Sequence, residues 1–217
     1  YELLAEFLTP IVKTYPSEKG ILSTSAGLQI LGGYGYCEDF NLELFYRDAR
    51  IHPIHEGTTG IQGQDILGRK VTMKNGRAFN YFISEVEKTV AEAEREETLS
   101  KYAMELKEYL ALFKTTTSEL LKIAASGKIE DFLSDATLYL EMAGNIAIGW
   151  QWLLQGLIAY KKSTAIENKF LKNFYNAKVT TMKYFFRYEL PLIKSLSEII
   201  LNDQRITVNI DKELFED

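Results

Sequence analysis

Apolar residues recur at intervals of three and four along most of this chain, which predicts amphipathic helices rather than strands. From residue 77 onward the pattern predicts three or four long helices, approximately at 77–97, 99–126, 129–162 and 166–202. Their connections are short: ASGK at 125–128 and KSTAIEN at 162–168. Long helices joined by short loops are typical of an antiparallel helical bundle, so the predicted fold class is all-α.

The first helix is predicted to end at a glycine pair. Ser17 follows Pro16 and precedes a glutamate, an arrangement typical of a helix N-cap. The helix should end at Gly32 and Gly33, because glycine is the usual residue just beyond a helix C-terminus. The next segment, YGYCEDF, is then predicted to be a loop.

Two shorter helices are predicted after this loop. Asn41 can cap LELFYRDARI, which must break near Pro53 because proline lacks the N–H that an interior helical position needs. Thr58 or Thr59 can cap the following helix, GIQGQDILGRKVTM.

The domain boundary is predicted near residues 72–77, around the turn sequence KNG at 74–76. It separates residues 1–73 from residues 74–217, where long helices dominate. The tail, RITVNID at 205–211, is predicted to be a short strand or an extended end.

The uncharged stretch at 142–160 is about long enough to span a bilayer. It contains Asn145, Gln151, Gln155 and three glycines, which are easily accommodated between packed helices. A helix that is apolar all round is usually buried, so we predict a central helix of the bundle and no membrane span.

The segment KFLKNFYNAKVTTMKYFFRYEL mixes lysines with aromatic residues, a composition that can bind single-stranded nucleic acid. The alternative, which we favour, is a helix with a core-facing stripe and lysines outside. The predicted stripe consists of Phe170, Phe174, Ala177, Thr181, Phe185 and Tyr188.

The net charge of −5 argues against nucleic-acid binding, which needs a basic face. With Cys37 as the single cysteine, no intramolecular disulfide can form, which fits a reducing compartment, and we predict the cytoplasm. The sequence starts at Tyr1 without a signal segment, so we expect part of a longer protein.

Three short motifs are weak candidates for chemistry. GGYGY at 32–36 lacks the dinucleotide spacing and follows a helix rather than a strand. HPIHE gathers His52 and His55, but Pro53 disfavours the helical spacing that such metal ligands need, so no metal site is predicted. Cys37 has no base beside it in the sequence, and a nucleophilic role is not favoured.

Glu56 is the strongest chemical candidate. It precedes a predicted helix start, where backbone N–H groups and the helix dipole stabilise negative charge, and Gly57 gives the chain freedom to project its carboxylate. Local chemistry alone leaves two interpretations open: a catalytic base, or a glutamate that only decorates a helix N-terminus.

Three blocks between residues 28 and 62 resemble the C-terminal catalytic region of acyl-CoA dehydrogenases: LQILGGYGY, YRDARI and IHEGTTGIQ. The family pattern is roughly Q-x-x-G-G-x-G-[FY], then R-D-[AS]-[RK], then I-[YH]-E-G-T-x-x-[IV]-Q. The continuation to GRKV is similar to the long-form subgroup with an appended helical domain, such as the methylmercaptopropionyl-CoA dehydrogenases.

This resemblance implies FAD-dependent α,β-dehydrogenation of an acyl-CoA thioester, as in fatty acid metabolism, with Glu56 as the α-proton base. The backbone N–H of Glu56 would bind the thioester carbonyl. His55 and Gly57 would contact the substrate.

The resemblance also implies a composite cofactor site in a homo-oligomer. Gln29, Gly32 and Gly33 would contact the FAD of a neighbouring subunit, and Thr58 would contact the FAD of its own subunit. Electron-transfer flavoprotein is the expected electron acceptor.

One departure from the family pattern is Gly60, where the family often has glutamine, so that side-chain contact to the flavin is lost. The family's upstream domains are also absent from this sequence, and we expect the chain alone to be inactive. The alternative is a non-catalytic helical module for oligomerisation or another protein interaction.

Overall fold

The computed structural model describes residues 1–215 and shows only helices, turns and loops within them. The α-helices are α1 (Glu2–Leu31), α2 (Leu42–Ala49), α3 (Thr59–Asp65), α4 (Met73–Ala93), α5 (Glu97–Ala125), α6 (Ile129–Leu133), α7 (Ala136–Ala165), α8 (Lys169–Tyr188), α9 (Leu192–Ile200) and α10 (Ile206–Asn209). Two 3-10 helices, η1 (Gly32–Tyr36) and η3 (Lys212–Phe215), and a π-helical segment, η2 (Ile66–Lys70), complete the set. The predicted all-α class is confirmed.

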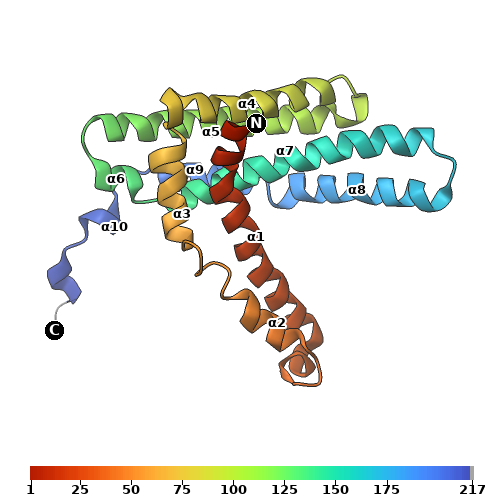
Figure 1. Cartoon of the computed structure of the whole chain (residues 1–217), viewed down its shortest axis with the longest axis horizontal. Coiled ribbons are helices and arrows are strands. Elements are labelled where there is room, and N and C mark those ends of the chain that lie inside the picture. Colours follow the sequence, from red (N-terminus) through yellow and green to blue (C-terminus); the bar gives the residue numbers. More distant parts are fainter. Residues whose placement is uncertain (216–217) are drawn as a thin grey trace.

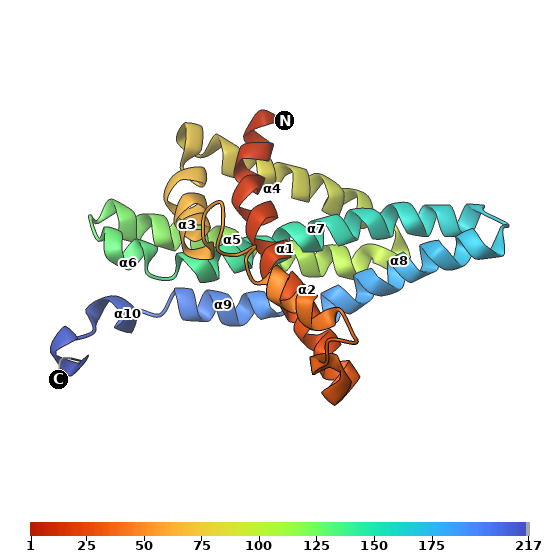
Figure 2. The same cartoon turned by 60° about the horizontal axis from the view of Figure 1, so that its bottom comes forward.

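The central helix is α7, which packs against α1, α3, α4, α5, α8 and α9. Figure 1 shows α4 and α5 as one antiparallel hairpin and α7 and α8 as a second. Figure 2 shows α9 lying along the bundle formed by these helices. Met142, Ile146 and Leu153 are completely buried, so the predicted central helix is confirmed. Within residues 1–215, no helix combines the length and hydrophobicity that crossing a bilayer requires.

A glycine allows α3 to lie directly against α7. A Cβ built on Gly63 would lie 2.8 Å from the carbonyl carbon and oxygen of Ala136. Because these are backbone atoms, they cannot rotate away as a side chain can, and a larger residue would push α3 off α7. Gly63 therefore allows α3, the helix that follows Glu56, to pack closely on the bundle.

The predicted helix start at Ser17 is wrong. Instead, α1 begins near the start of the chain and continues through Pro10 and Pro16. An interior proline costs about 3 kcal/mol. However, the first half of α1 also buries Phe7 and Ile11, each contributing about 1.5–3 kcal/mol. The Ser17 hydroxyl donates to a backbone carbonyl four residues earlier, at 2.5 Å, and caps nothing.

The predicted core-facing stripe of α8 is also wrong. Phe170, Phe174 and Tyr188 are 79%, 50% and 62% exposed, and only Phe185 of the predicted stripe is buried. The buried residues of α8 are Val179, Met182, Phe185 and Phe186. At 100° per residue their centre lies about 100° around the helix from the predicted stripe. Two faces of α8 carry aromatic residues, and packing against α7 decides which is buried.

Two predicted helices are divided. The span 129–162 becomes α6 and α7, separated by a turn before Ala136. The span 166–202 becomes α8 and α9, because Pro191 cannot donate to the helical ladder and instead stands at the N-cap of α9. The turn at 74–76 is confirmed, since all three residues have left-handed backbone angles.

The C-terminal segment contains a helical turn, α10, at Ile206–Asn209, so neither the predicted strand nor an entirely extended end is found there. Arg205 holds this segment on the bundle. Its guanidinium donates to Asp135 Oδ2 at 3.0 Å and to the Ile200 carbonyl at 2.6 Å.

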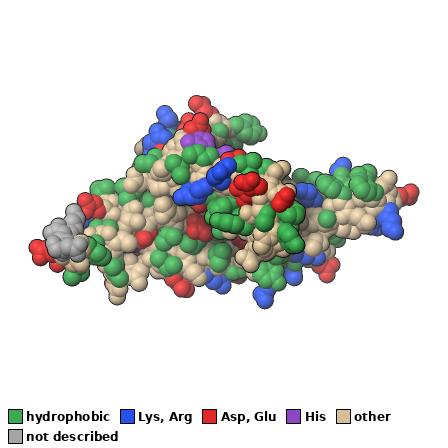
Figure 3. All heavy atoms as spheres, turned by 90° about the horizontal axis from the view of Figure 1, so that it is seen from below, with side chains coloured by type: hydrophobic (Ala, Val, Ile, Leu, Met, Phe, Trp, Pro, Cys, Tyr) green, Lys and Arg blue, Asp and Glu red, His purple; other side chains and the backbone are tan. Residues whose placement is uncertain are grey.

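Residues 20–51 form a projection that we call the arm. It consists of the second half of α1, η1 and α2, and it extends away from the bundle (Figure 1). Gly35 is its only buried residue. Figure 3 views the molecule from below relative to Figure 1, from the direction in which the arm projects, and shows many hydrophobic side chains at the surface. The large exposed apolar residues of the arm are Leu22, Ile30, Leu31, Tyr34, Tyr36, Phe40, Leu44, Phe45, Tyr46 and Ile51.

Candidate functional site

The loop that carries Glu56 joins α2 to α3 and occupies residues 50–58. Its first part is a series of tight turns, in which the N–H groups of Ile54 and His55 both donate to the Ile51 carbonyl, at 3.0 and 3.1 Å. The ring of Pro53 is buried. The Thr59 N–H donates to the Pro53 carbonyl at 3.2 Å and closes the loop.

Glu56 has a strained backbone. Its φ is 54°, in the left-handed region, and Gly57 follows with a φ of 92°. For a residue other than glycine, this conformation costs about 1–2 kcal/mol. Such strain persists only where the surrounding structure imposes it, and it is concentrated at functional sites. The Glu56 side chain is exposed.

Gln62 holds the strained turn. Its side-chain nitrogen donates to the Glu56 carbonyl at 3.3 Å. Gly57 has a φ of 92°, which glycine adopts without strain, and a Cβ there would lie 2.6 Å from that same nitrogen, so the turn favours glycine. Gln62 is part of the family pattern, and its role could not be predicted from the sequence. The structure identifies it as the residue that fixes the backbone of Glu56.

The two threonines after Gly57 have different tasks. Thr58 caps α3, as one of the two predicted alternatives proposed, because its hydroxyl accepts the Ile61 N–H at 3.4 Å. The Thr59 hydroxyl instead donates to the carboxylate of Glu18 on α1. This second contact joins residues far apart in the sequence and was not predicted.

The histidine pair lies at the surface of the same loop (Figure 3). Nδ1 of His52 and Nε2 of His55 are 3.2 Å apart. The predicted substrate residues, His55 and Gly57, are the two neighbours of Glu56 in the chain. Cys37 lies beyond the other end of α2, where its thiol contacts the Gly33 carbonyl at 3.6 Å.

The predicted flavin contacts of the arm lie apart from this loop. Gly32 ends α1 with a φ of 60°, and its N–H donates to the Gln29 carbonyl, as the predicted glycine stop requires. A Cβ on Gly33 would meet nothing within 4 Å, and all three residues are exposed. The eight residues of α2, about 12 Å of helix, separate this tip from the Glu56 loop.

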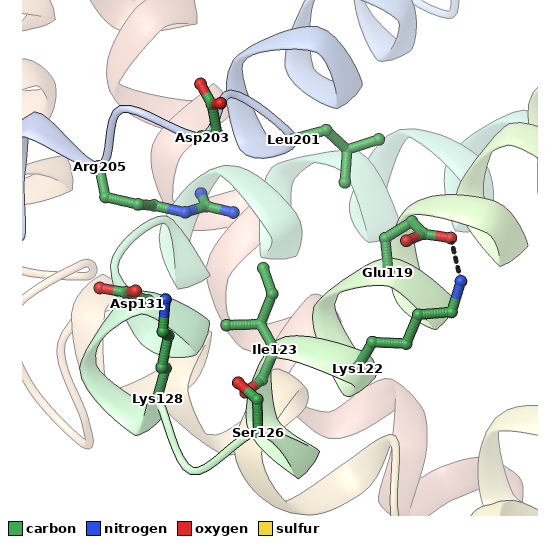
Figure 4. A pocket seen from close by; sticks show the side chains of 9 residues that line it. All are labelled: Glu119, Lys122, Ile123, Ser126, Lys128, Asp131, Leu201, Asp203 and Arg205. Atoms are coloured by element: carbon green, nitrogen blue, oxygen red, sulfur yellow. Dashed lines mark hydrogen bonds and ion pairs between the residues drawn. The ribbon is translucent and has the colours of Figure 1, made fainter.

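A cavity of about 440 Å³ lies at another place, between α5, α6 and the segment after α9 (Figure 4). Its acidic and basic residues are balanced in number, and Glu119 pairs with Lys122 at 2.7 Å. None of the predicted site residues lines it. The chemistry of the Glu56 loop is therefore separate from this cavity.

Two family models match successive parts of the chain. Residues 4–71 match the family model described as acyl-CoA dehydrogenase, C-terminal domain. Residues 82–211, more than half of the chain, match the model described as acetyl-CoA dehydrogenase C-terminal like.

Several curated relatives match the chain. The 3-methylmercaptopropionyl-CoA dehydrogenase of Ruegeria pomeroyi is 38% identical over 72% of this chain and 26% of the relative. A butyryl-CoA dehydrogenase of Syntrophomonas wolfei is 28% identical over 87% of this chain and 31% of its own length. A broad-specificity linear acyl-CoA dehydrogenase of Mycobacterium tuberculosis is 26% identical over 97% and 35%. The chain spans roughly a third or less of these relatives, and it belongs to the acyl-CoA dehydrogenase family.

Proposed function

We propose that the chain is the C-terminal part of an FAD-dependent acyl-CoA dehydrogenase and that Glu56 is its catalytic base. The observation that carries this proposal is the strained Glu56–Gly57 turn, which Gln62 holds in place. The reaction would remove the α-proton and the β-hydride of an acyl-CoA thioester to give a 2-enoyl-CoA. Bound FAD would supply the acceptor for the hydride.

The residues of the loop have distinct tasks in this reaction. The Glu56 carboxylate takes the α-proton, and its backbone N–H donates to the thioester carbonyl, where charge develops during proton removal. Within residues 1–215 no hydrogen-bond acceptor is found for the N–H groups of Glu56 or Gly57, which keeps these donors available. His55 and Gly57 lie beside the base and would contact the substrate.

The arm would serve the cofactor of a neighbouring subunit in a homo-oligomer. Gly32 and Gly33 fit a flavin contact because an exposed backbone without side chains permits close approach, and the exposed Gln29 side chain beside them can donate or accept hydrogen bonds. Their separation from Glu56 by the length of α2 supports a contact in a different subunit. Thr58, which lies next to Glu56, would contact the FAD of its own subunit.

Two parts of the chain would have different roles. Residues 1–73 would end the catalytic helical domain, and residues 74–217 would form an appended bundle. The rest of the flavin and substrate site would come from outside this chain, which spans at most 35% of the relatives named above. The 217 residues alone would then be inactive.

The substrate class that we propose is an acyl-CoA. The relatives' names include methylmercaptopropionyl, butyryl and broad-specificity linear substrates, so we propose no particular acyl chain. Electron-transfer flavoprotein is the proposed electron acceptor, and the cytoplasm the proposed location.

The test is Glu56→Gln in the full-length enzyme. We expect bound FAD to be retained, while acyl-CoA turnover and flavin bleaching fall by at least about 10³-fold, because the amide cannot take a proton. The control is Glu119→Gln, which removes an exposed carboxylate of α5 and should leave turnover unchanged. Normal turnover by Glu56→Gln would exclude this residue as the base.

A second candidate function is a non-catalytic helical module for oligomerisation, which the exposed apolar surface of the arm favours. The two functions differ in one observation. An acyl-CoA that bleaches the flavin of the full-length protein supports the dehydrogenase, and the absence of any bound flavin supports the module.

A further inference from the structure

The contact between Glu18 and Thr59 connects α1 to the first residue of α3. The Thr59 hydroxyl donates to Oε1 of Glu18, and both side chains are half-buried. Hydrogen bonds to an ionised carboxylate are stronger than those between neutral groups. The two residues are 41 positions apart, so this contact exists only because α1 and α3 pack together.

Thr59 connects the contact with Glu18 to the loop that carries Glu56. Its backbone N–H donates to the Pro53 carbonyl at 3.2 Å, so the residue that Glu18 holds also closes the loop around Glu56. On the other side of the strained turn, Gln62 holds the Glu56 carbonyl. A left-handed glutamate is stable only when such contacts determine its surroundings.

A cavity lies behind this contact, so the position of Thr59 depends more on the hydrogen bond to Glu18 than on packing. The cavity has a volume of about 330 Å³ and lies between α1, the start of α3 and α7. Thr59, Glu18 and the buried Thr14 line it, and the Thr14 hydroxyl has no hydrogen-bond partner. Because the space behind Thr59 is open, packing alone does not prevent the loop from shifting.

We propose that Glu18 is a positioning residue for Glu56, acting through the Thr59 hydroxyl. This inference rests on the proposed function, in which Glu56 is the base. Glu18 touches neither substrate nor cofactor in this role. It sets where the loop ends and thereby where the Glu56 carboxylate and N–H stand relative to the thioester.

The experiment uses the full-length, FAD-loaded enzyme with Glu18→Ala, Thr59→Val and the double variant. We expect each single change to lower kcat about 10- to 100-fold, because a small misplacement of a catalytic group has an effect of this size. KM for the acyl-CoA should stay within about threefold. The double variant should be no worse than the poorer single variant, since both changes remove one contact. Thr59→Ser restores the hydroxyl and should recover kcat.

Glu189→Ala is the matched control. Glu189 forms an ion pair at 2.9 Å with Lys19, the residue next to Glu18 on α1. Like Glu18, Glu189 is half-buried, but within residues 1–215 it makes no contact with the Glu56 loop. This variant should keep kcat within about twofold. FAD content and melting temperature identify any variant that fails to fold. If Glu18→Ala loses FAD, then Thr59→Val and its rescue by Thr59→Ser decide the question.

The outcomes separate this inference from the proposed function. Additive losses in the double variant, an unchanged kcat in Thr59→Val, or an equal loss in Glu189→Ala would each overturn the role of Glu18. Glu56→Gln is measured alongside. If it is inactive while Thr59→Val is fully active, only the positioning role fails. If Glu56→Gln is active, the proposed function itself fails.

Discussion

The bundle and the arm are both helical, but they bury their apolar residues differently. In the bundle, α7 is surrounded by helices of the same chain, and Tyr139, Ile146 and Leu153 are completely buried. In the arm, Ile30 and Tyr36 are 85% and 88% exposed. The helical pattern of apolar residues is a local property of the sequence, whereas burial of an apolar face requires a partner. The motifs of the acyl-CoA dehydrogenase family lie in and beside the arm, where this chain provides little core.

The largest expected effect compares a core residue with an arm residue. Leu153→Ala should lower the free energy of unfolding by about 2–5 kcal/mol, because it leaves a cavity at a fully buried site. Ile30→Ala should change it by less than about 0.5 kcal/mol, since its side chain is already in water. Urea denaturation of the 217-residue chain measures both. An equal loss at Ile30 would show that the arm has a packed partner.

A smaller effect concerns self-association through the arm. Phe45 and Tyr36 are exposed apolar groups, and we expect the chain to associate by burying them. Tyr36→Asp together with Phe45→Asp should weaken the dimer by at least about tenfold, or 1.4 kcal/mol. Light scattering and sedimentation over a concentration series measure this. Met104→Asp, at a residue of α5 that is 51% exposed, is the control. A wild-type chain that stays monomeric at every concentration would contradict the prediction.

The smallest effect is a pH dependence where α1 meets η2. Lys70 is buried and donates to Glu6, which lowers the pKa of Glu6 below its ordinary value of 4.5. The folded state therefore binds fewer protons than the unfolded state near that pH. The stability that Glu6 contributes should be complete above about pH 4.5 and lost as the pH falls through the lowered pKa. Glu6→Gln should reduce the melting temperature slightly at pH 7, and the difference from wild type should vanish at low pH. A difference that does not shrink as the pH falls below 4.5 would refute this account.

The sequence predicted the helix ends well where a single residue type decides them. Gly32 ends α1 with a positive φ that suits glycine, and the Thr58 hydroxyl caps α3. The predicted start at Ser17 failed because the first half of α1 packs on the bundle and buries Phe7 and Ile11, which offsets much of the cost of the two prolines. Local signals describe the energy of a few neighbouring residues, and tertiary packing can exceed it.

The candidate site shows the same division. Glu56 was identified from its motif, but its left-handed backbone and the hold of Gln62 on it are properties of the folded loop. Glu18 belongs to no motif that could be recognised in the sequence. Its contact with Thr59 depends on how α1 and α3 are placed by α7, and this information is distributed over the whole bundle.

The sequence by itself determined the all-α class, the buried central helix, the glycine and threonine helix ends, and the family motifs around Glu56. It could do so because helical periodicity, capping and motif spacing are encoded within a few turns of chain. Only the tertiary structure decided which face of α8 is buried, that α1 continues through its prolines, and that Glu18 reaches Thr59. Each of these features depends on which other helix packs against the segment. When a helix has two apolar faces, its own sequence does not specify which face is buried.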